Sequence, residues 1–130
     1  MEKKYLSEFK IAREFLEVSK INLKSSLRTS ANRLYFAFEK AVISYLLFLN
    51  KKVPKNHQKI WSLCSEFLGE EFYDHFRELY DLRMQADYGN ISKFFDLNEK
   101  VLKNLIKKSE LFIRNIELKM RKIENEKREF

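Results

Sequence analysis

The stretch from Asp81 to Gly89 holds the densest group of side chains in this sequence that could do chemistry, with an arginine, two aspartates and a phenol. Arg83 and Asp87 are four residues apart, so on a helix they can form an ordinary ion pair worth about 0.3 kcal/mol. Alternatively, Arg83 points to the inner side of the helix and holds a phosphate through two parallel hydrogen bonds. We take Arg83 as the candidate catalytic residue and Arg83, Asp87 and Tyr88 as candidate ligand-binding residues.

Asn32 and Arg33 form a second polar group, placed directly before a long apolar run. The Asn32 amide either faces a cleft and binds a phosphate, ribose or base, or hydrogen-bonds to a neighbouring helix. Both alternatives are compatible with the sequence. We therefore add Asn32 and Arg33 to the predicted ligand-binding set.

Several kinds of site are excluded by residue type and spacing. His57 and His75 lack a Cys, Asp or His partner at catalytic or metal-binding spacing, which predicts structural roles for both. A glycine-rich phosphate loop, a Ser/His/Asp order and a paired-carboxylate motif are missing, which argues against an ordinary hydrolase or NTP-consuming enzyme. We predict no metal and no cofactor. The single cysteine, Cys64, cannot form an intramolecular disulfide and is expected in the core.

Helices must position these residues, because apolar side chains recur every three to four positions along most of the chain. Pro54 interrupts that pattern, and Gly69 and Gly89 mark two further helix ends. The expected helices cover about residues 3–23, 30–49, 56–67, 70–88 and 97 to the charged end.

Two local features follow from the residues of the first two helices. In the first helix, Leu6 and Ile21 are expected on the same buried face as Phe9 and Leu16. In the second, the hydroxyl of Thr29 or Ser30 is expected to cap the N-terminus.

The expected fold is all-α, an antiparallel up-and-down bundle of four to five helices. One domain spans residues 1–130, and the charged end of the last helix, about residues 117–130, projects from it. The second helix is apolar on nearly all sides, which places it at the centre of the bundle and favours sharing it with a second copy of the chain.

Composition limits the partners and the compartment. A formal charge of +7, from 26 basic and 19 acidic residues, favours nucleic acid or an acidic protein as a partner, although solvated lysines explain it equally well. The most apolar run, Ala41 to Leu49, is too short to cross a membrane, and the first residues do not resemble an export signal. We expect a cytoplasmic protein with no membrane contact. Most tyrosines and phenylalanines follow helix stripes, which indicates core packing over base stacking.

Three motifs, in this order and spacing, resemble the HEPN family over about residues 5–116. They are Asn-Arg-Leu-Tyr-Phe-Ala at residues 32–37, Pro54 followed by His57, and Leu-Arg-x-x-Ala-Asp-Tyr-Gly at residues 82–89, where x is any residue. The resemblance implies a helical bundle that forms a homodimer and a minimal nucleotidyltransferase as partner, as a toxin–antitoxin or nucleotide-handling pair. It also implies that Arg83 matches the arginine of the family's ribonuclease motif.

The chain departs from that motif at one position. The family places a histidine four to six residues after the arginine, but Tyr88 stands there and no histidine follows. A phenol with a reference pKa of about 10 is a poor base near neutral pH. The sequence therefore favours a binding module for nucleotide or RNA. The alternatives are a metal-independent endoribonuclease toxin, in which Arg83 works with Asp87, Tyr88 or His57, and a non-catalytic helical scaffold.

Overall fold

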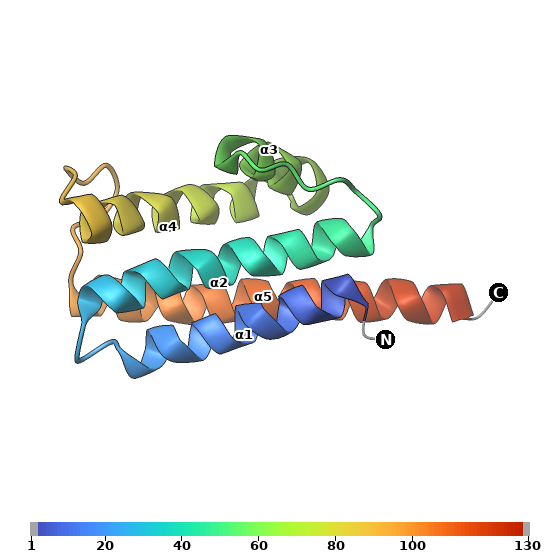
Figure 1. Cartoon of the computed structure of the whole chain (residues 1–130), viewed down its shortest axis with the longest axis horizontal. Coiled ribbons are helices and arrows are strands. Elements are labelled where there is room, and N and C mark those ends of the chain that lie inside the picture. The colour runs from blue at the N-terminus through green and yellow to red at the C-terminus, as the bar shows by residue number, and fades with distance from the viewer. Residues whose placement is uncertain (1–2, 129–130) are drawn as a thin grey trace.

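The computed structural model describes residues 3–128 and shows five helices joined by short connections (Figure 1). They are α1 (Lys4–Ile21), α2 (Leu27–Phe48), α3 (His57–Leu68), α4 (Glu70–Tyr88) and α5 (Glu99–Arg128). No strand occurs within the described residues. The predicted all-α bundle is confirmed.

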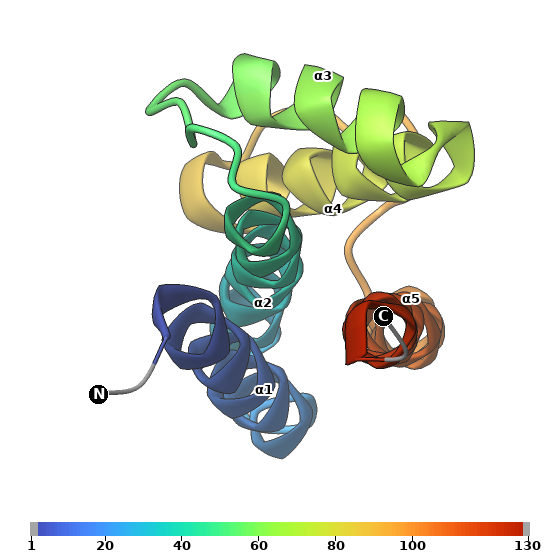
Figure 2. The same cartoon turned by 90° about the vertical axis from the view of Figure 1, so that its right-hand side faces the viewer.

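Helices α1, α2, α4 and α5 lie roughly along one axis, and α2 runs opposite to both α1 and α4 (Figure 1). Helix α3 crosses that axis and packs against α4 (Figure 2). Helix α2 contacts each of the other four, as its nearly continuous apolar surface predicts. The central helix therefore supplies the largest share of the core, and it carries the candidate site residues Asn32 and Arg33.

The predicted start of α2 was wrong. The helix begins at Leu27, and the side chain of Ser26, not of Thr29 or Ser30, accepts the hydrogen bond from the Thr29 N–H at 3.2 Å. Ser30 is buried, and its hydroxyl donates to the Ser19 carbonyl at 2.7 Å. Serine caps at least as well as threonine, and the packing of Ser30 against α1 leaves Ser26 to cap the helix.

The buried face of α1 also differs from the prediction. Phe9, Ala12 and Leu16 are buried as expected, whereas Leu6 and Ile21 are 44% and 74% exposed. Ser19, three residues after Leu16, takes the next buried position. A step of three residues stays on the same helix face, whereas the step of five residues from Leu16 to Ile21 turns away from it. A hydrogen bond from its hydroxyl to the Ser30 carbonyl, 2.8 Å long, lets this serine be buried.

The helix ends follow local rules. Asn56 caps α3 by accepting from the Lys59 N–H at 3.2 Å, two residues after Pro54 in the connection from α2. Gly69 joins α3 to α4 with a φ of 101°, and Gly89 ends α4 in the left-handed conformation with a φ of 68°. Glycine is the residue that adopts such φ values without strain. Asn98 caps α5 through a 2.9 Å bond from the Val101 N–H.

His75 and Cys64 are fully buried, as expected for structural residues. The His75 ring packs between Phe38 and Phe112, each with ring centroids 4.9 Å away, and its Nε2 lies 2.7 Å from the Ser109 hydroxyl of α5. This contact links α4 to α5 through the core. No helix among residues 3–128 is long and apolar enough to span a membrane.

Candidate functional site

A cleft of about 640 Å³ lies between the start of α2 and the end of α4. We call it the α2/α4 cleft. Four of the five predicted ligand-binding residues line it, and the fifth, Arg83, lies beside it on α4. The lining residues are Arg28, Thr29, Asn32, Arg33, Ala86, Asp87 and Tyr88.

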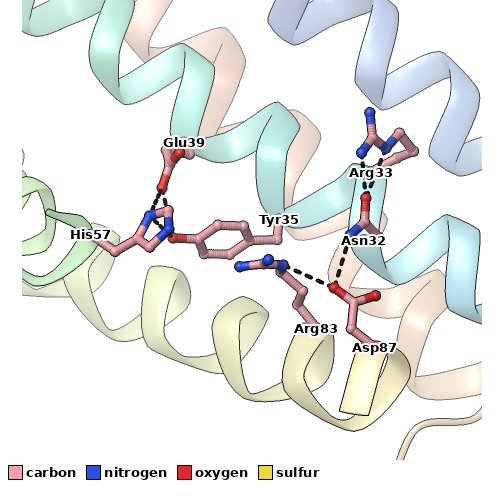
Figure 3. Close-up of polar contacts among 7 residues, drawn as sticks. All are labelled: Asn32, Arg33, Tyr35, Glu39, His57, Arg83 and Asp87. Carbon is pink, nitrogen blue, oxygen red and sulfur yellow. Dashed lines mark hydrogen bonds and ion pairs between the residues drawn. The ribbon is translucent and has the colours of Figure 1, made fainter. Parts of the chain in front are cut away.

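Four polar side chains are linked across this cleft, and we call them the polar chain (Figure 3). The Arg33 Nε donates to the Asn32 Oδ1 at 2.9 Å, and the Asn32 Nδ2 donates to the Asp87 Oδ2 at 3.0 Å. The Arg83 Nε donates to the same Asp87 oxygen at 3.1 Å. Asn32 thus both lines the cleft and bonds to a neighbouring helix, and the intrahelical pair of Arg83 and Asp87 is formed.

The ring of Phe36 holds the two arginines of the polar chain close together. The guanidinium carbon of Arg83 lies 4.7 Å from the Phe36 ring centroid, and that of Arg33 lies 5.5 Å from it. Arg83 also lies 5.4 Å from the Tyr35 ring centroid. The negative faces of these rings attract cations, and Asp87 offsets part of the repulsion between the two positive charges.

The Arg83 side chain faces the interior, with 14% of its surface exposed. Its Nε is bonded to Asp87, while its two terminal nitrogens form no hydrogen bond with any of the residues 3–128. A guanidinium that is fixed by stacking and by one nitrogen keeps its other donors for a bidentate acceptor such as phosphate.

Tyr88 lines the α2/α4 cleft but is 67% exposed, and its hydroxyl makes no hydrogen bond with the described residues. Arg28 also lines the cleft but is not in the predicted set, because position 28 lies between the helices predicted over about residues 3–23 and 30–49. It lies on the first turn of α2, on the same side as Asn32, because positions i and i+4 share a helix face.

A second polar cluster lies on the other side of the Tyr35 ring from the polar chain (Figure 3). The Glu39 Oε2 accepts from the Tyr35 hydroxyl at 2.7 Å and lies 2.7 Å from the His57 Nδ1. The Trp61 indole N–H donates to the Tyr35 oxygen at 3.3 Å. The Glu39 side chain is almost buried, whereas the His57 side chain is 41% exposed.

Electrostatics fixes the protonation of the phenol in this cluster. Burial and the neighbouring Glu39 carboxylate both raise the pKa of Tyr35 far above its usual value. Tyr35 therefore stays protonated and donates to Glu39. The Glu39 carboxylate, fixed by the hydrogen bond from Tyr35, can orient the imidazole of His57 through Nδ1. The other ring nitrogen of His57 is left for solvent or a ligand.

The partner of His57 was missed from the sequence, because the two residues are 18 positions apart and belong to different helices. One signal was present. Glu39 interrupts the apolar run of the second helix four residues after Tyr35, so it lies on the same buried face. A carboxylate on a buried face requires a donor, and the phenol and the imidazole both supply contacts.

The two clusters together offer a cation for phosphate and an oriented imidazole, both within 6 Å of the centre of the Tyr35 ring. Among the described residues, no group of three or more His, Cys, Asp or Glu side chains could hold a metal ion.

A family model described as HEPN domain matches residues 7–119, which is most of the chain. The match confirms the resemblance predicted from residues 32–37, 54–57 and 82–89. It supports a helical module with a nucleotide- or RNA-related role. A search of curated proteins gives no significant match.

Proposed function

The chain belongs to the HEPN family, and from this premise we propose that it is a nucleotide- or RNA-binding module that holds a phosphate group at the α2/α4 cleft. The polar chain is the observation that carries this proposal. It places the guanidiniums of Arg33 and Arg83 near one aromatic ring, that of Phe36, and leaves the terminal nitrogens of Arg83 without a hydrogen-bond partner among residues 3–128. The net charge of +7 adds long-range attraction for a polyanion.

Phosphate is a better fit to this cleft than a neutral ligand. Arg28, Arg33 and Arg83 bring three positive charges, and Asp87 is the acidic residue among the lining side chains. The Asp87 oxygen that faces the polar chain already accepts two hydrogen bonds, which reduces its repulsion of an anion. Tyr88 at the exposed rim can contact a ribose or base.

Binding of labelled single-stranded RNA, followed by fluorescence anisotropy at low salt, tests the proposal. We expect Arg83→Gln to weaken binding about tenfold, because a charge-assisted bidentate contact is lost, and Arg83→Lys to weaken it less. The slope of log affinity against log salt should fall by about 0.7 for the lost phosphate contact. Arg114→Gln, at an exposed α5 arginine that forms no ion pair with described residues, is the matched control. Equal affinity of the Arg83 and Arg114 variants would refute the cleft as the phosphate site.

We further propose that the protein acts as a homodimer with a minimal nucleotidyltransferase partner, in a toxin–antitoxin-like pair. The family membership and the exposed Tyr88 beside the cleft support this arrangement. Light scattering of the purified protein should give twice the 15.8 kDa chain mass. A pulldown from the native cell should recover a nucleotidyltransferase. A monomer in solution and a pulldown without such an enzyme would contradict both parts.

A specific observation favours a second candidate function, metal-independent RNA cleavage. Arg83 would stabilise the charge on the phosphorane, and Asp87, Tyr88 or His57 would assist proton transfer. Of these three, His57 has a buried carboxylate at 2.7 Å, which is the arrangement that orients a general base. The oxygen of Asp87 is occupied by Asn32 and Arg83, and Tyr88 has no bonded neighbour among residues 3–128.

Incubation of purified protein with total RNA in the presence of EDTA tests this candidate. Cleavage by the wild type that is lost in both Arg83→Ala and His57→Ala would establish it. Equal cleavage by all three proteins would indicate a contaminating nuclease, and no cleavage by any of them would leave the binding function.

The scaffold alternative has a separate test. If the polar chain only joins α2 to α4, replacing Arg83 and Asp87 together should lower stability and leave RNA affinity unchanged. If the chain binds phosphate, the same double variant should lose affinity.

A further inference from the structure

A second hollow, distinct from the α2/α4 cleft, lies between α3, α4 and the connection that follows α4. We call it the α3/α4 groove. It has a volume of about 370 Å³ and is lined by both aromatic and basic side chains. None of its lining residues belongs to the set predicted from the sequence.

The wall formed by the connection is held in place by one buried carboxylate. Asp81 on α4 is 7% exposed and accepts from the backbone N–H of Lys93 at 3.1 Å and of Phe94 at 3.3 Å. Gln85 adds a 2.7 Å bond to the Phe95 carbonyl and accepts from the Leu97 N–H at 3.0 Å. The loop is therefore a fixed surface, and the acidic group nearest the groove already has partners.

The opposite wall is aromatic. Trp61 and Tyr80 pack edge to face with ring centroids 4.7 Å apart, and both are half-buried. Phe94 on the loop is 44% exposed although its own backbone is fixed by Asp81. Partly exposed rings carried on a fixed backbone are platforms on which planar rings stack.

Two cations complete the groove. Arg77 and Lys93 are both exposed and form no ion pair with any side chain in residues 3–128. The Arg77 guanidinium carbon lies 5.8 Å from the Phe94 ring centroid, so a charge stands next to the aromatic platform. A ligand that matches these features has a planar ring at one end and a negative charge at the other.

We infer that the α3/α4 groove binds one nucleotide unit, with its base on Trp61, Tyr80 and Phe94 and its phosphate at Arg77 and Lys93. The unit is either a free nucleotide or part of a single-stranded RNA. Only the second alternative, a nucleotide that is part of an RNA, rests on the proposed function. Tyr80 also packs on Tyr35, with centroids 5.5 Å apart, so the groove shares a wall with the candidate site.

The fluorescence of Trp61 reports this groove directly, because the chain has one tryptophan. Full-length protein is titrated with AMP, with ribose 5-phosphate, with adenosine and with a short oligoadenylate. We expect quenching by AMP or by the oligonucleotide, and about tenfold weaker binding of the two ligands that lack the base or the phosphate. Quenching by AMP identifies a free nucleotide as a sufficient ligand, and quenching by the oligonucleotide alone identifies RNA.

Arg77→Ala should lower the affinity for the ligand that quenches Trp61 about fivefold or more, and Lys93→Ala should lower it somewhat less. The control Arg114→Ala should leave this affinity unchanged. Phe94→Ala should lower the affinities for adenosine and for AMP by the same factor, because it removes only stacking on the base. These side chains are exposed, and far-ultraviolet circular dichroism confirms that each variant is folded.

Absence of quenching by both AMP and the oligonucleotide would overturn the inference. So would quenching that persists unchanged in Arg77→Ala and Phe94→Ala, because the ligand would then lie elsewhere. The variant Arg83→Gln separates this inference from the proposed function. If it loses RNA anisotropy but keeps Trp61 quenching by AMP, both sites stand. If it keeps full RNA affinity while Arg77→Ala loses it, the cleft fails and the groove stands.

Discussion

The two histidines of this chain occupy opposite environments. His75 is fully buried between two phenylalanine rings and bonds to Ser109, whereas the His57 side chain is 41% exposed and lies against the Glu39 carboxylate. Both appear in the sequence as single histidines without a nearby partner. His75 also has an acidic neighbour, Glu78, whose Oε2 lies 3.9 Å from its Nδ1. The difference therefore shows that exposure, not residue type, decides which imidazole is available to a ligand.

The largest effect should come from removing the core histidine. His75→Ala leaves a cavity between α4 and α5 and removes the partner of the buried Ser109 hydroxyl. We expect the free energy of unfolding to fall by about 3 kcal/mol. Urea denaturation followed by circular dichroism measures it. A loss below about 1 kcal/mol would show that His75 does not join the two helices.

Acidification should lower the stability of the fold through His75. Burial lowers the pKa of His75. Below pH ~6.5 the unfolded chain therefore binds a proton at this imidazole that the folded chain does not bind. Stability should therefore fall on acidification from about pH 6.5 to 5, by up to about 1.4 kcal/mol per pH unit. Glu78 opposes part of this shift because it raises the pKa of His75, whereas Lys108 lowers it further. The His75 imidazole in turn holds the pKa of Glu78 below its usual range, beneath this window.

The matched variant for the pH experiment is His75→Gln, whose amide can bond to Ser109 but does not titrate in this range. Its stability should change less between pH 6.5 and 5 than that of the wild type. Parallel curves for the two proteins would assign the pH dependence to other groups.

A smaller effect is expected at the other histidine. His57→Ala removes one contact of Glu39, but Tyr35 still donates to that carboxylate and water can enter through the exposed side. We expect a loss of about 1 kcal/mol in the same urea experiment. A loss as large as that of His75→Ala would make His57 a structural residue and weaken the case for proton transfer.

The smallest effect on stability should come from the polar chain. Asp87→Ala breaks its bonds to Asn32 and Arg83 at the rim of the cleft, where solvent replaces them, and should cost about 0.5 kcal/mol. The free energy of unfolding from urea titrations checks this. A cost above about 2 kcal/mol would favour the scaffold alternative, because the polar chain would then be a main support of the fold.

The helices and their order could be predicted from the sequence because these features depend on neighbours in the chain. Apolar spacing marks most buried positions, with Leu6 and Ile21 as exceptions. Pro54 and Asn56 set the start of α3, and Gly89 ends α4 with a positive φ. The choice of Ser26 as the cap of α2 could not be predicted, since it depends on how Ser19 and Ser30 pack between helices.

For the candidate site, the sequence by itself determined the residue types and the helix faces, including Arg83 above Asp87 and Asn32 beside Arg33. Only the tertiary structure decided the rest: the partner of His57, the two guanidiniums around Phe36 and the groove beside Trp61. The physical reason is the range of the forces involved. A helix turn relates residues three or four apart, whereas these contacts join separate helices, and burial of the whole core sets their distances.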